Sequence, residues 1–352
     1  MAVDFTHTLI VAISATALFD LSESENHLLQ LIEQRPTRAV KDFRDYMAVR
    51  ENDPLAIGAG YPLIKALLNL NNHCSQTVDT EIDINIETPL VEVVVVSKSS
   101  PDTGIQVLNA IREHELSISR SAFISGSSVA PYIDDFNVDL FLTTNRDDAQ
   151  QVADANICAC AILDATPVNT YELDTEQLRI AFDGDAVLFD DSGELLYKQK
   201  GLRAFHEREA QMRDTPIEKG PYAELLIKLS KLQERLPARM NHCPIRIALV
   251  TARNAPADLR AIKTLREWGV DVDMAFFLGG LEKTAVLKTF APHIFFDDSI
   301  KHIAAARSFV PTALVPYHSA SLLYADGHLT TDKDASLLNF TPAQQPIFAF
   351  NH

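Results

Sequence analysis

Carboxylate, hydroxyl and ammonium side chains follow the apolar segments in the second half of the chain. A D-x-D pair comes directly after the apolar run Leu178–Phe182, and a D-D pair comes after His293–Phe296. In an open α/β sheet the carboxyl ends of parallel strands meet at one edge, where such sheets bind ligands. We therefore expect these side chains to converge on one site. They are Asp183, Asp185, Thr251, Lys283, Asp297 and Asp298.

The charges of this set indicate a divalent cation. Four carboxylates bring −4 and one lysine returns +1, while two like charges ~4 Å apart repel by about 4 kcal/mol at an effective dielectric constant near 20. Mg²⁺ takes oxygen ligands, needs few carboxylates and leaves room for a substrate phosphate. Protonation of one carboxyl group would remove the remaining negative excess and supply a general acid. These are the parts of phosphoryl transfer.

The segments that must position these groups alternate between apolar runs and helical patterns, which is typical of an α/β chain with a parallel sheet. Helices are predicted at Ala223–Leu236 and at Pro256–Trp268, the second with Asn254 as its N-cap and Gly269 as its stop. Polar residues make Asp164–Glu176 the best linker, so we expect domains at 1–170 and 171–352. The clearest strands are Leu9–Ile13, Val91–Val96, Asp139–Leu142, Leu178–Phe182, Ile245–Val250 and His293–Phe296.

The two halves resemble one another at low identity. A shift of 154 residues sets Val96–Thr144 on Val250–Asp298 without a gap, and shifts of 162 and 169 align Phe43 with Phe205 and Ser14 with Asp183. Three segments in the same order favour an internal duplication over coincidence. The first half has Ser14, Thr16, Val129, Thr143 and Thr144 where the second half has its charged groups. We interpret the first half as a degenerate copy with a structural or regulatory role.

The composition excludes several classes of protein. The 352 residues carry a net charge of −17 with an isoelectric point near 5.0, which argues against a partner that is nucleic acid or a membrane surface. The apolar run Thr8–Phe19 is too short to span a bilayer and lacks the basic flank of a signal peptide. Four cysteines in so long a chain do not form a disulfide framework. A cytoplasmic protein with reduced thiols is expected.

The motifs resemble those of the haloacid-dehalogenase-like (HAD) phosphohydrolases, which use this order of elements on a Rossmann-like sheet. The resemblance implies that Asp183 attacks phosphorus to form an aspartyl-phosphate, and that Asp185 serves as acid and then as base. Thr251 would hold a phosphoryl oxygen, and Lys283 would neutralise developing charge. The implied Mg²⁺ ligands are the Asp183 carboxylate, the Asp185 backbone carbonyl, and Asp297 or Asp298.

A closer resemblance, to the cytosolic 5′-nucleotidase I family, covers most of the chain. It is carried by RIAFDGDAVLFDD (Arg179–Asp191), CPIRIALVTAR (Cys243–Arg253), AIKTLREWGVDVDMAFFLGGLEK (Ala261–Lys283) and PHIFFDD (Pro292–Asp298). The implied reaction is hydrolysis of nucleoside 5′-monophosphates, with AMP-like purines preferred. This chain has an insertion at about 193–219. The resemblance to HAD-like enzymes implies that this insertion is a cap that closes over the leaving group.

The fold class expected is therefore α/β: a HAD-like Rossmannoid three-layer sandwich with a parallel sheet and a small helical cap, duplicated with a degenerate N-terminal copy. For two residues the sequence leaves alternatives open. Phe205 could stack on a base or pack the cap onto the body, and Arg253 could reach the phosphate or ribose or form a surface salt bridge. The expected substrate-binding residues are Phe205, Thr251, Ala252, Arg253 and Lys283.

Two other functions stay open at this stage. One is a HAD-type phosphatase of a sugar phosphate or another small phosphomonoester. The other is a phospho-acceptor signalling module, which the order of the acidic pairs disfavours. In this chain the D-x-D pair comes first in the sequence and the D-D pair comes last. A nucleotide effector such as ADP or ATP and assembly into a homo-oligomer are also left open.

Overall fold

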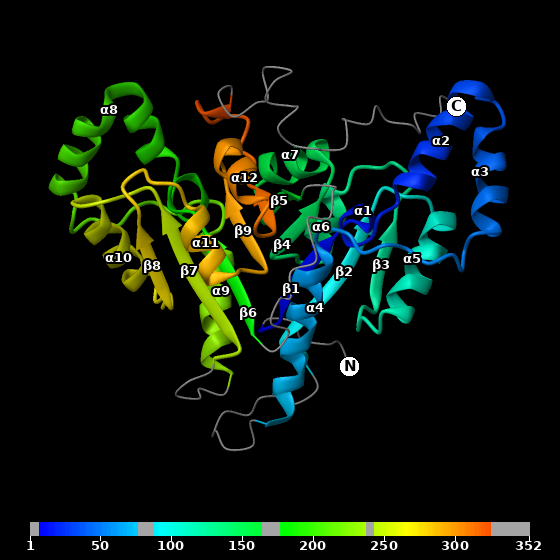
Figure 1. Cartoon of the computed structure of the whole chain (residues 1–352), viewed down its shortest axis with the longest axis horizontal. Coiled ribbons are helices and arrows are strands. Elements are labelled where there is room, and N and C mark those ends of the chain that lie inside the picture. The colour runs from blue at the N-terminus through cyan, green and yellow to red at the C-terminus, as the bar shows by residue number, and fades with distance from the viewer. Residues whose placement is uncertain (1–6, 77–87, 164–176, 237–242, 325–352) are drawn as a thin grey trace.

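The structure is a computed structural model that describes residues 7–76, 88–163, 177–236 and 243–324 (Figure 1). The expected domain boundary at residue 170 and the expected linker Asp164–Glu176 lie outside these residues. Within them, the apolar runs of the sequence form one sheet with helices on both faces. No described helix has the length and apolarity that crossing a bilayer requires.

The strands are short and almost entirely buried. Every residue of the first, second and fifth strands is buried, as expected for strands that helices cover on both faces. The six strands predicted from the sequence are confirmed to within one residue at each end. The described strands are β1 (Leu9–Ile13), β2 (Val91–Ser97), β3 (Arg120–Phe123), β4 (Leu140–Thr143), β5 (Ala159–Leu163), β6 (Leu178–Phe182), β7 (Ile245–Thr251), β8 (Met274–Phe277), β9 (Ile294–Asp297) and β10 (Thr312–Leu314).

The two halves of the sheet have the same strand order. The sheet runs β3-β2-β1-β4-β5-β10-β9-β6-β7-β8, so each half places its strands in the same sequence outward from the centre. A shift of 154 residues carries the bounds of β2, β3 and β4 onto those of β7, β8 and β9, and a shift of 169 carries β1 onto β6. The pairing registers of β1 with β2 and of β6 with β7 obey the same shifts.

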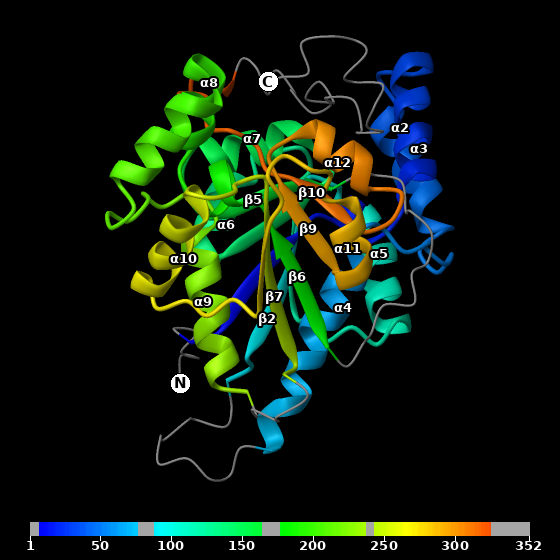
Figure 2. The same ribbon diagram turned by 60° about the vertical axis from the view of Figure 1, so that its left-hand side comes forward.

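The helices divide between the two faces of the sheet (Figures 1 and 2). Buried residues of α4, α5, α9 and α10 belong to the largest core cluster, whereas those of α6, α7, α11 and α12 pack in smaller clusters against the other face. The helices are α1 (Ala15–Leu18), α2 (Ser22–Gln34), α3 (Ala39–Ala48), α4 (Tyr61–Asn69), α5 (Pro101–Glu113), α6 (Ala130–Asp135), α7 (Arg146–Asp154), α8 (Ser192–Gln211), α9 (Ala223–Glu234), α10 (Ala257–Glu267), α11 (Thr284–Phe290) and α12 (Ile300–Ala306), with a 3₁₀ helix η1 (Leu70–Gln76) and a single π-turn η2 (Gly184–Leu188).

Both helices predicted from periodicity are present, with shorter ends. The stop at Gly269 is confirmed by its φ of 69°, which favours glycine. The predicted N-cap is wrong: α10 begins at Ala257 after Pro256, and no side chain caps it. The Asn254 amide oxygen instead lies 2.9 Å from Nε2 of His206 on α8, so Asn254 links the end of β7 to that helix.

The two halves meet along a short antiparallel seam between β5 and β10. Only two residue pairs form it, Ala313 with Leu163 and Leu314 with Ile162. Side chains of α9 add further links to the first half: the buried Tyr222 hydroxyl donates to the Cys160 carbonyl oxygen at 2.8 Å, and Lys228 lies 2.6 Å from Asp139. The seam therefore depends on side-chain contacts as well as on the ladder.

Replacing Tyr222 by phenylalanine tests this link between the halves. The Tyr222→Phe variant leaves the Cys160 carbonyl without its hydroxyl donor, so we expect the free energy of unfolding to fall by about 1–2 kcal/mol in urea denaturation. The matched control is Tyr46→Phe, since the Tyr46 hydroxyl bonds to an exposed carboxylate of Glu23; it should change stability by less than about 0.5 kcal/mol. Equal effects in both variants would contradict a stabilising role for the Tyr222 hydroxyl.

Candidate active site

Asp183 lies at the carboxyl end of β6, where the chain turns sharply. Its backbone N–H donates to the Phe296 carbonyl oxygen of the neighbouring β9 at 2.9 Å. Its carboxylate Oδ1 accepts the N–H of Gly184 at 2.7 Å. The side chain is buried, and no described residue donates to Oδ2. One carboxylate oxygen is thus held and the other is left for a ligand.

Lys283 joins two carboxylates of this edge. It comes just before α11, and its Nζ lies 2.8 Å from Asp183 Oδ1 and 2.7 Å from Asp297 Oδ2. Burial lowers the pKa of the Lys283 ammonium, but the two carboxylates outweigh burial and raise that pKa above its ordinary value. Lys283 therefore stays charged between Asp183 and Asp297.

The carboxyl groups of the cluster differ in their protonation. Burial raises the pKa of Asp183 to about 6, although Lys283 acts against it. Burial also acts to raise the pKa of Asp297, but Lys283 and His302 outweigh it and bring that pKa below its ordinary value. Burial, Asp297 and Asp183 raise the pKa of Asp298 well above its ordinary value, and Asp298 accepts a hydrogen bond from the Tyr317 hydroxyl. Of the D-D pair, Asp298 is thus the residue whose pKa is raised and Asp297 the one whose pKa is lowered.

Three side chains offer atoms for a metal ion. Ligand atoms of Asp183, Asp297 and His302 lie within 4.8 Å of one another. Asp297 is fully buried, and its Oδ1 accepts the Ser299 N–H at 2.8 Å, while His302 Nδ1 lies 3.1 Å from its Oδ2. The carboxyl groups of Asp185 and Asp298 are not part of this group of atoms. Carboxylate oxygens suit Mg²⁺.

The Asp185 carboxylate faces Arg253 rather than the cluster. Arg253 Nε lies 2.8 Å from Asp185 Oδ2, and Nη2 lies 2.6 Å from Oδ1. This bidentate pair fixes the orientation of Asp185. The start of α8 lies against this pair, because a Cβ atom at Gly193 would lie 2.4 Å from the side-chain oxygen Oδ1 of Asp185. A larger residue at this position would therefore have to displace the Asp185 carboxyl group.

Arg253 continues into a buried charge network that reaches α8. Its Nη1 bonds to Glu209 Oε2 at 2.7 Å, and Glu209 Oε1 bonds to Arg260 on α10, also at 2.7 Å. The Arg253 guanidinium lies 5.3 Å from the ring centres of Phe189 and of Phe205. In this structure Phe205 packs the helical segment onto the body, and Arg253 forms a buried salt bridge. The packing of Phe205 is one of the alternatives left open by the sequence. The salt bridge of Arg253 was expected at the surface, and it is instead buried because Arg253 lies between α8 and the body.

The remaining predicted residues lie close to the turn after Asp183. Thr251 ends β7 and is buried, and its hydroxyl would lie 3.0 Å from a Cβ at Gly184. Ala252 is exposed, and its carbonyl oxygen accepts the N–H of Gly280 at 3.1 Å. Gly280 has a φ of 83°, but Gly126 forms the same turn in the first half with a φ of 84°. Gly280 is therefore required by the conformation of this turn, which both halves share.

Four residues of this region were not predicted as functional from the sequence: His302, Glu209, Arg260 and Tyr317. His302 contacts Asp297, with Nδ1 lying 3.1 Å from Oδ2. Its position five residues after Asp297, on the helix that follows the D-D pair, is the signal that could have found it. Glu209 and Arg260 stand out only once α8 and α10 are seen to pack together, and no motif in the sequence marks Tyr317.

The comparisons with known proteins agree with this geometry. A profile described as 5′-nucleotidase matches residues 1–322. The chain belongs to the 5′-nucleotidase family. Human cytosolic 5′-nucleotidase 1B is 31% identical to it over 304 residues, which is 86% of this chain and 47% of that protein. The chain thus spans about half the length of this relative.

One solved structure gives no further information. Histidinol dehydrogenase from Elizabethkingia anophelis aligns with 91% of this chain and 82% of its own at 10% identity. The TM-score of 0.21 is too low to carry an argument about the fold.

Substitution of Glu209 tests the network around Asp185. Glu209→Gln leaves two buried guanidinium groups with one counter-charge fewer, so we expect the free energy of unfolding to fall by about 3 kcal/mol. The matched control on the same helix is Glu207→Gln, since Glu207 pairs with a side chain of Arg203 that is 92% exposed. It should change stability by less than about 0.5 kcal/mol in the same urea titration. Similar stability of the two variants would show that the network does not hold α8.

Proposed function

We propose that this chain is a Mg²⁺-dependent 5′-nucleotidase that hydrolyses AMP-like nucleoside 5′-monophosphates to nucleoside and phosphate. The observation that carries the proposal is the buried Asp183 carboxylate, held on one oxygen by Lys283 and Gly184 and open on the other, in a member of the 5′-nucleotidase family. The name of the human relative, cytosolic 5′-nucleotidase 1B, supports the same reaction and a cytoplasmic location.

Asp183 is the nucleophile in this proposal. Its Oδ2 attacks phosphorus, the bond to the nucleoside 5′-oxygen breaks, and an aspartyl-phosphate forms. The leaving oxygen takes a proton from Asp185. Water then attacks phosphorus, gives a proton to Asp185, and releases phosphate while the Asp183 carboxylate is restored. Lys283 and the Thr251 hydroxyl lie beside this carboxylate and stabilise charge on the phosphoryl oxygens.

Arg253 sets the orientation of Asp185. The bidentate pair turns both carboxyl oxygens of Asp185 toward the guanidinium. A dianionic phosphate competes with Asp185 for this guanidinium, and that competition frees the Asp185 side chain to exchange a proton with the leaving oxygen and then with water. Arg253 thus serves as the substrate-binding residue, with Ala252 beside it in the same loop. Phe205 keeps Arg253 in position.

The residues of the cluster fit a Mg²⁺ ion. The Asp183 and Asp297 carboxylates would hold it together with the Asp185 backbone carbonyl, because the ligand atoms of Asp183 and Asp297 lie within 4.8 Å of one another and the carboxyl group of Asp298 is not part of that group. When bound, Mg²⁺ supplies positive charge that draws a phosphate toward a site lined by carboxylates. Lys283 occupies Oδ1 of Asp183 and Oδ2 of Asp297. Asp183 Oδ2 is left for the ion, whereas Asp297 Oδ1 also accepts the Ser299 N–H.

The fold supports a HAD-like interpretation with an internal duplication. We infer a catalytic domain at 171–352, with a cap at about 193–219, and a degenerate copy at 1–170. The repeated strand order and the constant shifts of 154 and 169 residues support the duplication. In Figure 1, α8 lies above the second half, and α2 and α3 lie in the corresponding place above the first. The proposal includes a nucleotide effector such as ADP or ATP and assembly into a homo-oligomer.

The nucleophile is tested by Asp183→Asn. We expect phosphate release from AMP to fall by about 1000-fold or more, because an amide cannot attack phosphorus, while circular dichroism stays that of the wild type. The matched control is Ser14→Ala, at the corresponding position of the first half, which should keep kcat within twofold. Near-wild-type turnover of Asp183→Asn would remove Asp183 as the nucleophile. Faster release from glucose 6-phosphate than from AMP would favour a sugar phosphatase.

The metal is tested by chelation. Dialysis against EDTA should abolish AMP hydrolysis, and Mg²⁺ should restore it, because the cluster otherwise repels the phosphate. Mg²⁺ should also raise the melting temperature of the wild type more than that of Asp297→Asn, since the ion relieves repulsion between the carboxylates. Full turnover in the presence of EDTA would contradict a requirement for a divalent cation.

A further inference from the structure

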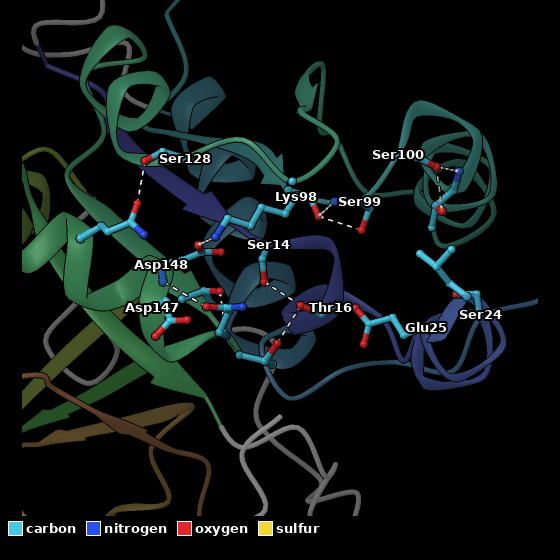
Figure 3. Close-up of a pocket in the computed structure, with 18 of the residues that line it drawn as sticks. Ser14, Thr16, Ser24, Glu25, Lys98, Ser99, Ser100, Ser128, Asp147 and Asp148 are labelled. Carbon is cyan, nitrogen blue, oxygen red and sulfur yellow. Dashed lines mark hydrogen bonds and ion pairs between the residues drawn. The ribbon is translucent and has the colours of Figure 1, made fainter. Parts of the chain in front are cut away.

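The first half of the chain has an open pocket at the place that corresponds to the active site. The pocket has a volume of about 290 Å³ and lies at the carboxyl ends of β1, β2 and β4 (Figure 3). Ser14 and Thr16 follow β1 as Asp183 and Asp185 follow β6, and Thr143 and Thr144 stand where Asp297 and Asp298 stand. The pocket is therefore distinct from the catalytic cluster.

The pocket is open because a large side chain is missing. In the second half the Arg253 guanidinium fills the space between Phe205 and Asp185. The shift of 154 residues puts Ser99 at the position of Arg253 and Val129 at that of Lys283. A hydroxymethyl group in place of a guanidinium leaves room for a small ligand, and the volume is at the lower end of the range for ligand pockets.

The wall of the pocket is rich in hydrogen-bond acceptors. The hydroxyl groups of Ser14 and Thr16 lie 3.1 Å apart, and that of Thr16 lies 2.7 Å from Thr144. Each hydroxyl has one donor and two acceptor positions, so pairs of this kind leave acceptors unused. Figure 3 shows Glu25, from α2, facing the same space as Ser14 and Thr16. No described residue donates to the Glu25 carboxylate.

The charge of the pocket disfavours a phosphate. Its charged lining residues are Glu25, Asp147 and Asp148, with Lys98 as the one cation. Lys98 is already paired with Asp148, so Asp147, and Glu25 when it is ionised, leave a negative excess. Burial and the charge of Asp20 raise the pKa of Glu25 to about 7, and no cation among the described lining residues pairs with it.

One side of the pocket is apolar. Leu28 of α2 and Phe43 of α3 line it, and Phe43 aligns with Phe205 under the shift of 162 residues. An aromatic ring on one side and carboxylate and hydroxyl acceptors on the other match a flat base joined to a sugar with several hydroxyl groups.

We propose that this pocket binds an uncharged nucleoside, with the sugar hydroxyls donating to Glu25 and Thr16 and the base against Phe43. The pocket would sense the product of the reaction rather than the nucleotide. The choice of a nucleoside rests on the proposed function, because hydrolysis of a nucleoside monophosphate supplies it. The acceptor-rich, negatively charged wall does not depend on that function.

Calorimetry with adenosine tests the pocket. Ser99→Arg puts a guanidinium into the space, so adenosine affinity should fall at least about tenfold, whereas the matched control Ser99→Ala should stay within twofold of the wild type. Glu25→Ala removes an acceptor and should also weaken adenosine by about tenfold or more. Hydrogen exchange should show that adenosine protects α2 and α3 in the wild type and not in Ser99→Arg. ADP should bind there at least about tenfold more weakly than adenosine.

Three results would overturn the proposal: equal adenosine affinity in the wild type, Ser99→Arg and Glu25→Ala; protection confined to α8; or tighter binding of ADP than of adenosine at α2 and α3. Phosphate release from AMP, measured on the same preparations, separates this proposal from the proposed function. Adenosine binding without AMP hydrolysis overturns the proposed 5′-nucleotidase activity and leaves the nucleoside pocket standing. Hydrolysis without adenosine binding at α2 and α3 overturns the nucleoside pocket alone.

Discussion

The ammonium of Lys283 between the Asp183 and Asp297 carboxylates is the interaction on which the candidate active site depends. Both carboxylates are buried, and two such groups repel strongly in a region of low dielectric constant. Lys283 lets them remain ionised side by side, because its Nζ lies 2.8 Å from Asp183 Oδ1 and 2.7 Å from Asp297 Oδ2. Because Lys283 directly precedes α11, its ion pairs also fix the position of this helix against the ends of β6 and β9. The same contacts therefore neutralise the carboxylates and pack the second half.

A second constraint separates Asp185, the proposed acid–base residue, from Asp183 and Asp297. Arg253 draws the Asp185 side chain away from Asp183 and toward α8. Because Glu209 and Arg260 extend the same network to α8 and α10, the orientation of Asp185 is tied to the position of the helical segment above the site. A movement of α8 would thus be transmitted to Asp185 through two ion pairs rather than through contact with a substrate.

Much of this arrangement follows from sequence patterns. Continuous apolar runs such as Ile245–Val250 predict buried parallel strands, and a polar residue at the end of each run predicts the edge where the side chains gather. Sequence patterns predict less well which side chains form ion pairs or hydrogen bonds between helices that are far apart in the chain. Glu209 and Tyr317 lie in segments without a motif, and which carboxyl group has a raised pKa depends on burial, which spacing does not encode. The strand β10 was missed because its three residues lie in a run of only four between Pro311 and Pro316, too short to show a periodicity.

The seam between β5 and β10 has a consequence for how the chain is made. During synthesis β5 is complete long before β10 leaves the ribosome, so its outer edge stays unpaired while most of the second half is still being translated. Unpaired edges of apolar strands are sites of aggregation. The edge of β5 in the first half therefore stays exposed until β10 has been synthesised and pairs with it. Until then, a chaperone bound to this edge would protect the nascent chain from aggregation.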